Sequence, residues 1–518
     1  MAEDPLGGGP RTEDQGLLGD SSKGPQGVTH RIGIRSTGLV VFGGRAFSAF
    51  TGLLFIVMAT RWLAPKQLGL WEVVIDLATF SAYPIGVVAY WATRDIARGH
   101  LAGRTAFVLG TAMSGFGLLL YFVLSIVTNS HLADSYLPFL LGSLLVPLGY
   151  WSQITTSIVV GYRPVATGYS LVVSEIVKIA SAYEALYVYK LGIEGVILAL
   201  IISYFVNSLV GTYMVRGATK EQLQLSVAKR WLRLSWLPAV SYLPPIFLAA
   251  DTYIASLGFG TAVAGIYQPA FTVASVVGYS SALAYSLYPL LLRGGSKRLP
   301  AITIDFSLLF GIPMAVGGVV LADPILHLFG PKYMPGTLGL SILSVMFLFQ
   351  ALSQTVDQTL LGTEKADAGE DRSFRSLMKS NLIWVPLINL CAALVYLSGM
   401  YVVLSFAFSN GLGTSVAVAL WAMVQVFVTI FFLIIKARRA SRSAKLFGGA
   451  SVAYYLVSAL VMGFVVYLLS GMTLNRGAGT LAYGLELTTL IALGAAVYFG
   501  LLYALDIRFR TMAHSLMK

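Results

Sequence analysis

The stretch Arg61-Trp62-Leu63-Ala64-Pro65-Lys66-Gln67-Leu68-Gly69-Leu70-Trp71 joins two apolar blocks, residues 36–61 and 68–92. Each block has the length of about twenty residues that a helix needs to cross the hydrocarbon core of a membrane. In lipid the backbone polar groups must be satisfied within the segment, so such blocks are expected to be helices. The stretch therefore predicts a short turn between two membrane-spanning helices.

Composition extends this prediction to the whole chain. Of its 518 residues, 57% are hydrophobic and 11% are charged, whereas an ordinary soluble domain has about 25% charged residues. The sequence predicts an all-α polytopic membrane protein with about 14 transmembrane helices. The expected spans are 36–61, 68–92, 105–128, 135–161, 167–190, 192–215, 232–257, 263–291, 301–322, 337–361, 378–397, 403–435, 447–470 and 480–505.

The basic residues orient these spans. With both termini in the cytoplasm, 28 of the 35 Lys and Arg residues fall on the cytoplasmic side and 5 on the outer side. Cytoplasmic loops of membrane proteins carry an excess of Lys and Arg, so this distribution supports the orientation. It also explains the net charge of +12 without nucleic acid as a partner, because the bases are dispersed over short loops that meet lipid head groups. We expect a multi-pass protein of the cell (plasma or inner) membrane.

A weak internal repeat predicts two halves. Leu68-Gly69-Leu70-Trp71 and Ala264-Gly265-Ile266-Tyr267 each open a span, at an offset of 196 residues. Like-oriented halves of six spans each would meet at a central interface that holds the binding site. The expected units are a disordered cytoplasmic tail 1–35, a six-helix bundle 36–215, a cytoplasmic linker 216–231, a second bundle 232–435, a basic loop 436–446, an additional helix pair 447–505 and a cytoplasmic tail 506–518.

Several of these stretches resemble the polysaccharide-biosynthesis flippases of the multidrug, oligosaccharidyl-lipid and polysaccharide exporter superfamily. Residues 61–71 resemble that family's turn between its first two helices, and residues 93–98 resemble the inner end of its second helix. Asp251 with residues 264–270, the turn 328–333 and the run 354–362 are similar to its second-half motifs. The resemblance covers about residues 36–440 and reflects fold more than substrate.

This resemblance implies two six-helix bundles arranged in a V, with the last two helices like those of the longer members. It implies alternating access that carries a polyprenyl-(pyro)phosphate-linked oligosaccharide from the cytoplasmic to the outer leaflet, for polysaccharide or glycoprotein assembly. The implied partners are that lipid-linked oligosaccharide, membrane lipids and glycan-assembly enzymes, and we expect a monomer.

Ionisable groups inside the spans are the candidates for a site, because each costs about 2.5–3.5 kcal/mol at a helix centre and normally faces a cavity or a partner. Arg45 lies near mid-bilayer, where its forked guanidinium could hold a substrate phosphate. The competing interpretation is an internal salt bridge to Asp76. Asp251, in the seventh span, is a further substrate-binding candidate, or else a helix-end carboxylate paired with a lipid-facing amine.

Glu175 and Lys178 are three residues apart and share a helix face, so they are either an ion pair or a coupling site. Asp76, Asp251 and Glu175 are the candidates for coupling to a proton or cation. Pro238, Pro244 and Pro245 interrupt the seventh span, and this kink is either a hinge or a static bend. Tryptophans near the span ends, including Trp71 and Trp231, are expected to be interfacial anchors.

No catalytic site, metal cluster or organic cofactor is predicted. The sequence contains no P-loop, its five histidines are scattered and its single cysteine, Cys391, precludes a disulfide. An ion-coupled multidrug exporter of the same superfamily is the first alternative, although the central Arg45 would repel cationic drugs. A membrane enzyme of polysaccharide assembly is the second, although the predicted outer loops are short.

Overall fold

The computed structural model describes residues 34–132, 135–163, 166–220, 222–281, 296–364, 380–446, 451–477 and 479–511, with the single residues 287 and 291. The side chains of residues 34–43, 45, 46, 237 and 451 also lie outside the description. The predicted tail 1–35 and the end of the predicted tail 506–518 therefore fall almost wholly outside it. Within the described ranges every regular element is helical, which confirms the predicted all-α class.

The first half of the chain contributes α1 to α8. Their bounds are α1 Ile34–Trp62, α2 Pro65–Ala82, α3 Ile85–Ala97, α4 Gly103–Leu132, α5 Leu137–Gly142, α6 Leu145–Tyr162, α7 Ala166–Tyr183 with the π-turn η1 Glu184–Val188, and α8 Gly192–Met214. The connection to the second half holds the 3-10 turn η2 Ala218–Lys220 and α9 Leu225–Arg233.

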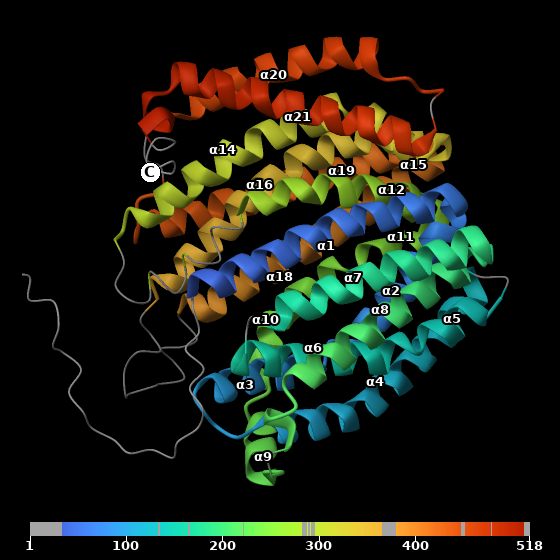
Figure 1. The fold of residues 1–518 in the computed structure, drawn as a ribbon, viewed down its shortest axis with the longest axis vertical. Coiled ribbons are helices and arrows are strands. Elements are labelled where there is room, and N and C mark those ends of the chain that lie inside the picture. Colours follow the sequence, from blue (N-terminus) through green and yellow to red (C-terminus); the bar gives the residue numbers. More distant parts are fainter. Residues whose placement is uncertain are drawn as a thin grey trace, which may run out of the picture.

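The second half follows as α10 Trp236–Leu248, α11 Asp251–Phe259, α12 Thr261–Ser275, the 3-10 turn η3 Val276–Ser281, α14 Leu299–Val320, α15 Ala322–Phe329, the 3-10 turn η4 Pro331–Gly336, α16 Thr337–Gly362, α18 Asn381–Ser409 and α19 Thr414–Ala440. The last pair is α20 Ser451–Thr473 and α21 Thr480–Leu505. In Figure 1 the long helices run side by side, and α20 and α21 lie at one edge, next to α14.

Ten described helices are long and apolar enough to cross a membrane, or eleven if the bent pair α2 and α3 is one span. The count of 14 is therefore not confirmed. The other three expected spans correspond to α1, to α7 with η1, and to α10 with α11. In the span of α7 with η1, the charged residues Glu175 and Lys178 interrupt the apolar run. In the span of α10 with α11, a turn at Ala249–Ala250 separates the two helices.

One predicted boundary was wrong. Hydropathy predicts spans at 378–397 and 403–435, but α18 continues to Ser409 and the turn lies at 410–413. Apolar residues run through the predicted break, so hydropathy gave no signal there. The chain turns where Gly411 adopts a φ of +67°, a conformation that favours glycine.

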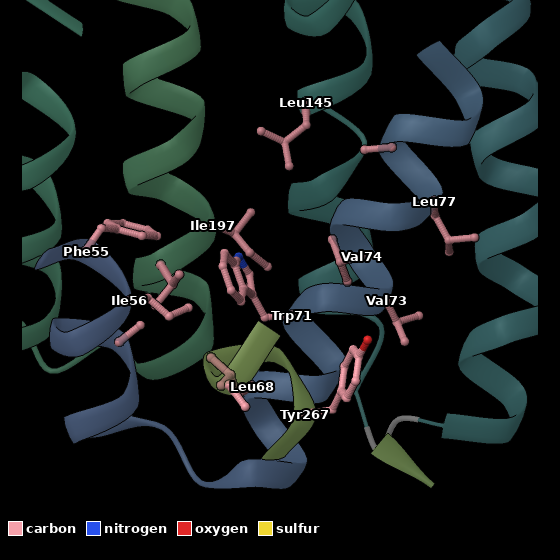
Figure 2. Close-up of a cluster of buried hydrophobic side chains, with 14 of the residues drawn as sticks. Phe55, Ile56, Leu68, Trp71, Val73, Val74, Leu77, Leu145, Ile197 and Tyr267 are labelled. Carbon is pink, nitrogen blue, oxygen red and sulfur yellow. The ribbon is translucent and has the colours of Figure 1, made fainter. Parts of the chain in front are cut away.

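The two halves share one apolar core. Buried side chains from α1, α2, α8 and α12 pack together in it, including Phe55, Leu68, Ile197 and Tyr267 (Figure 2). α2 packs along α12, and α1 packs along α7. A second core joins α14 and α16 to α20 and α21, so the additional pair is attached to the second half.

Candidate functional site

A cavity of about 280 Å³ lies where the two halves meet. The first half contributes α1 and α2 to its wall, and the second half contributes α12 and η3. The lining residues combine hydroxyl, amide, carboxyl and aromatic groups: Ser48, Phe55, Trp71, Glu72, Gln268, Thr272, Ser275 and Tyr279. Such a wall can hydrogen-bond to a polyhydroxylated ligand and stack against its rings.

Glu72 carries the carboxyl group among the described lining residues, and only 6% of it is exposed. Gln268 of α12, in the second half, lines the same cavity. No role for Glu72 was predicted from the sequence. A signal was available, because Glu72 and Asp76 are four residues apart and therefore share one face of α2.

Glu72 belongs to a cluster of three carboxyl groups. It interacts electrostatically with Asp76, on the next turn of α2, and with Asp251, the first residue of α11. The Thr252 hydroxyl donates to Asp76, and the Thr252 backbone N–H donates to Asp251 Oδ1 over 2.7 Å. Buried carboxylates that interact in this way repel one another unless protons accompany them. The structure thus brings together two predicted candidates, Asp76 and Asp251, and adds Glu72.

The second half holds Asp251 through a chain of buried aromatic groups. Tyr396 donates its hydroxyl to Asp251 Oδ2 over 2.6 Å, and Trp421 donates its indole N–H to the Tyr396 oxygen over 2.7 Å. Trp421 stacks on Tyr267, with ring centroids 3.8 Å apart. The expected alternative of a lipid-facing amine as the partner of Asp251 was wrong, because its described partners are Tyr396 and Thr252 and it is 7% exposed.

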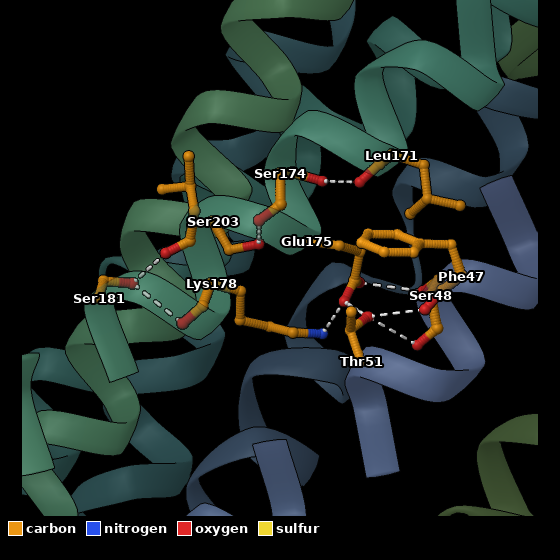
Figure 3. A network of polar contacts seen from close by, with 10 residues as sticks. Phe47, Ser48, Thr51, Leu171, Ser174, Glu175, Lys178, Ser181 and Ser203 are labelled. Atoms are coloured by element: carbon orange, nitrogen blue, oxygen red, sulfur yellow. Dashed lines mark hydrogen bonds and ion pairs between the residues drawn. The ribbon is translucent and has the colours of Figure 1, made fainter. Parts of the chain in front are cut away.

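The pairing of Glu175 with Lys178 is confirmed. Lys178 Nζ lies 2.6 Å from Glu175 Oε2, and both side chains are nearly buried. Glu175 also accepts hydrogen bonds from Ser48, over 3.0 Å, and from Thr51. Figure 3 shows this network joining α7 to α1. Since Ser48 also lines the cavity, the ion pair fixes the part of α1 that forms the cavity wall.

The turns that carry the family resemblance meet at one end of the molecule. Arg61 donates to the carbonyl oxygens of Leu328, over 2.8 Å, and of His327, over 3.2 Å. Tyr333 donates to the Leu63 carbonyl oxygen over 2.9 Å. These contacts join the first half to the second at the predicted outer end. We call them, together with the glycine contact described next, the outer seal.

The repeated glycines pack against each other in the outer seal. A Cβ atom on Gly69 would lie 1.7 Å from the carbonyl oxygen of Thr261, and one on Gly265 would lie 1.9 Å from that of Pro65. Only glycine permits this approach of α2 to α12. The second match of the repeat, residues 97–99 with 292–294, falls partly outside the described residues.

Arg45 and the three prolines of the predicted kink lie on α1 and α10. Arg45 lies on α1, but its side chain is outside the described residues, so neither its role nor its pairing with Asp76 is tested. Pro244 and Pro245 lie inside α10, which ends at Leu248 before α11 begins at Asp251. Pro238 lies in the first turn of α10. A break therefore follows the prolines, and a hinge at this break stays a prediction.

Two tryptophans were wrongly expected to be interfacial anchors. Trp71 is 7% exposed and packs near Phe55, and Trp231 is fully buried. Among the described residues no group of His, Cys, Asp or Glu is arranged to hold a metal ion.

Comparison with known proteins shows the fold. No family model matches the sequence, and no curated protein matches it. Among solved structures, the chain is similar to the lipid II flippase MurJ in an inward closed conformation, with a TM-score of 0.60 and 14% identity over 90% of this chain and 99% of that chain. It is also similar to an inward-facing multidrug resistance MATE family transporter of the MOP superfamily, with a TM-score of 0.57 and 12% identity over 76% of this chain and 95% of that chain. This chain therefore has the fold of these transporters.

Proposed function

We propose that this chain is a flippase that moves a polyprenyl-(pyro)phosphate-linked oligosaccharide from the cytoplasmic to the outer leaflet by alternating access. The extent of the likeness to the lipid II flippase carries this proposal. That flippase matches 90% of the chain and the MATE transporter 76%. The two covered shares differ by 14% of 518 residues, which is about 70 residues. This number is close to the size of the region that holds α20 and α21.

The cavity at the boundary between the halves supports the proposal. Its hydroxyl, amide and aromatic groups suit the glycan of the substrate. Residue 45 precedes Ser48, Ala49 and Gly52 by three, four and seven positions, and these three line the cavity. Residues at these spacings share one face of a helix. Arg45 is therefore our candidate for holding the phosphate at the edge of the cavity.

Transport requires the outer seal to open and close. The break after Pro245 is the candidate hinge. The carboxyl cluster of Asp76, Asp251 and Glu72 is the candidate coupling site for a proton. Glu175 is paired with Lys178, so this proposal gives Glu175 a structural role. The chain would act as a monomer in the cell membrane, with both termini cytoplasmic, beside the enzymes that assemble the glycan.

The test is a flipping assay in liposomes, with the purified protein and defined fluorescent polyprenyl-pyrophosphate-linked sugars. Arg45→Ala should abolish flipping while the protein still inserts and folds. Arg442→Ala, at an exposed site after α19, is the matched control for loss of one positive charge. Normal flipping by the Arg45→Ala protein would refute the assigned role, and no flipping by the unmodified protein with any such lipid would refute the proposed function.

Glu72 favours a second candidate, the ion-coupled multidrug exporter. An acidic group in the cavity wall suits a cationic drug better than a pyrophosphate. Efflux of a cationic dye by the reconstituted protein, abolished by Glu72→Gln, would support the exporter. No efflux by the unmodified protein would leave the flippase as the better explanation, and efflux that Glu72→Gln leaves unchanged would refute the role assigned to Glu72.

A further inference from the structure

The connection between the halves contains a helix with three distinct faces. In α9 one face packs inward, formed by half-buried Val227 with buried Ala228 and Trp231, of which Trp231 is fully buried. Beside it lies an apolar face of Leu225 and Leu232, which are 65% and 47% exposed. The third face is basic and exposed, with Lys229, Arg230 and Arg233.

The buried face fixes α9 to the first half. Asp95, near the end of α3, is 4% exposed. It accepts the Trp231 indole N–H over 2.8 Å and an Arg230 guanidinium N–H over 2.5 Å. Just before α9, the Gln224 backbone N–H donates to the Thr105 hydroxyl of α4 over 2.9 Å. These contacts determine which side of α9 faces outward, so the exposed leucines and bases keep a defined orientation.

The neighbouring turn between α3 and α4 extends the same surface. Arg94, Arg98 and Arg104 are exposed there, and Leu101 is 60% exposed. The described acidic group at this place is Asp95, which is already paired with Arg230. We call this combination of α9 with residues 94–104 the basic collar. Its exposed charges are positive, and exposed leucines lie among them.

The position of the basic collar suits the surface of a membrane. Figure 1 shows α9 at the edge of the molecule, with its axis across the direction of the long helices. A helix that crosses the span direction at the end of a bundle lies in the plane of the membrane interface. Exposed leucines beside exposed bases are typical of such interfacial helices, because the leucines enter the acyl boundary while the bases meet the head groups.

We propose that the basic collar is a binding surface for anionic phospholipids of the bilayer. Lys229 and Arg233 contact the phosphates, and Leu225 and Leu232 rest among the upper acyl carbons. Arg230 remains bound to Asp95 and anchors the helix. A nucleic acid would match the charge but leave the exposed leucines in water, which favours the lipid surface as the partner.

The test measures lipid binding by the full chain and needs no transport. The protein is purified in detergent and titrated with phosphatidylglycerol or phosphatidylcholine, and bound lipids are counted by native mass spectrometry. A basic residue near an anionic surface contributes about 1 kcal/mol, so Lys229→Gln with Arg233→Gln should weaken phosphatidylglycerol binding about 30-fold. The Asp95 contacts of Arg230 and Trp231 are untouched by these changes.

Two control proteins make the result decisive. Arg438→Gln with Arg442→Gln removes the same charge from exposed positions at the end of α19 and should leave this binding site intact. Lys229→Arg with Arg233→Lys keeps the charge and should retain binding. Equal binding of both lipids by the unmodified protein, or an equal loss in the two glutamine variants, would overturn the proposal. A melting temperature in phosphatidylcholine identifies any variant that fails to fold. If the glutamine variant fails to fold, Leu225→Ser with Leu232→Ser replaces it, and weaker phosphatidylglycerol binding is again expected.

Discussion

Replacing either glycine of the outer seal should open the predicted outer end of the molecule. An alanine Cβ at position 69 would lie 1.7 Å from a backbone oxygen, and one at position 265 would lie 1.9 Å from another. Ordinary carbon–oxygen contacts are about 3.3 Å, so α2 and α12 would have to separate locally by about 1.5 Å. The obstructing atoms belong to the backbone, and no change of rotamer relieves the clash.

The energetic cost follows from overpacking. Inserting a methyl group into a well-packed contact costs about 1–3 kcal/mol, which here falls on the conformer with a closed outer seal. An equilibrium between closed and open conformers would therefore shift about 5- to 150-fold toward the open one for each substitution. The contact is absent once the halves separate, so the open conformer carries no such penalty.

The assay is a distance measurement across the outer seal. In a Cys391→Ser background, Gln67→Cys and Lys332→Cys introduce two exposed sites for spin labels, one on each half. Pulsed electron resonance should report longer distances in Gly69→Ala and in Gly265→Ala than in the parent. Gly115→Ala is the control, because a Cβ there meets no atom within 4 Å. The reasoning is refuted if Gly69→Ala and Gly265→Ala give the same distance distribution as the control.

Two further substitutions test the buried networks through thermal unfolding in a fixed detergent. Tyr396→Phe removes the donor to Asp251 and leaves the Trp421 N–H without its acceptor, so it should cost about 1–3 kcal/mol; an unchanged melting temperature would contradict the network. Lys178→Met leaves the Glu175 carboxylate buried with hydroxyl partners alone and should cost about 3–5 kcal/mol, whereas Glu175→Gln with Lys178→Met should recover part of that loss. A double variant as unstable as Lys178→Met would contradict the ion pair as the cause.

The sequence predicted the features that depend on local pattern. Hydropathy located the helices, the spacing of Glu175 and Lys178 predicted their ion pair, and the repeat matched the two glycines that meet in the outer seal. These predictions succeeded because helix periodicity and span length are set by residues close together in the chain. The contact between Gly69 and Gly265 could not be predicted, since a repeat shows equivalence and not proximity.

Other features depend on packing between distant segments. Glu72 lies near the start of α2, and the packing of α12 from the other half against α2 buries it. Trp231 has the position of an interfacial anchor, but Asp95 binds its N–H over 2.8 Å. The turn at 410–413 was misplaced because the apolar run continues across the expected break. In each case the chemistry of the side chain can be read from the sequence, but its surroundings depend on segments that only the fold brings together.

The outer seal places equivalent residues of the two repeats face to face. Gly69 lies against the start of α12 and Gly265 against the start of α2, so each glycine approaches the turn that precedes the other. A pair of identical single halves, related by a two-fold axis, could make the same contact twice. The outer seal is thus a self-complementary contact within one chain, and a side chain larger than glycine on either helix would disturb the same contact from opposite sides.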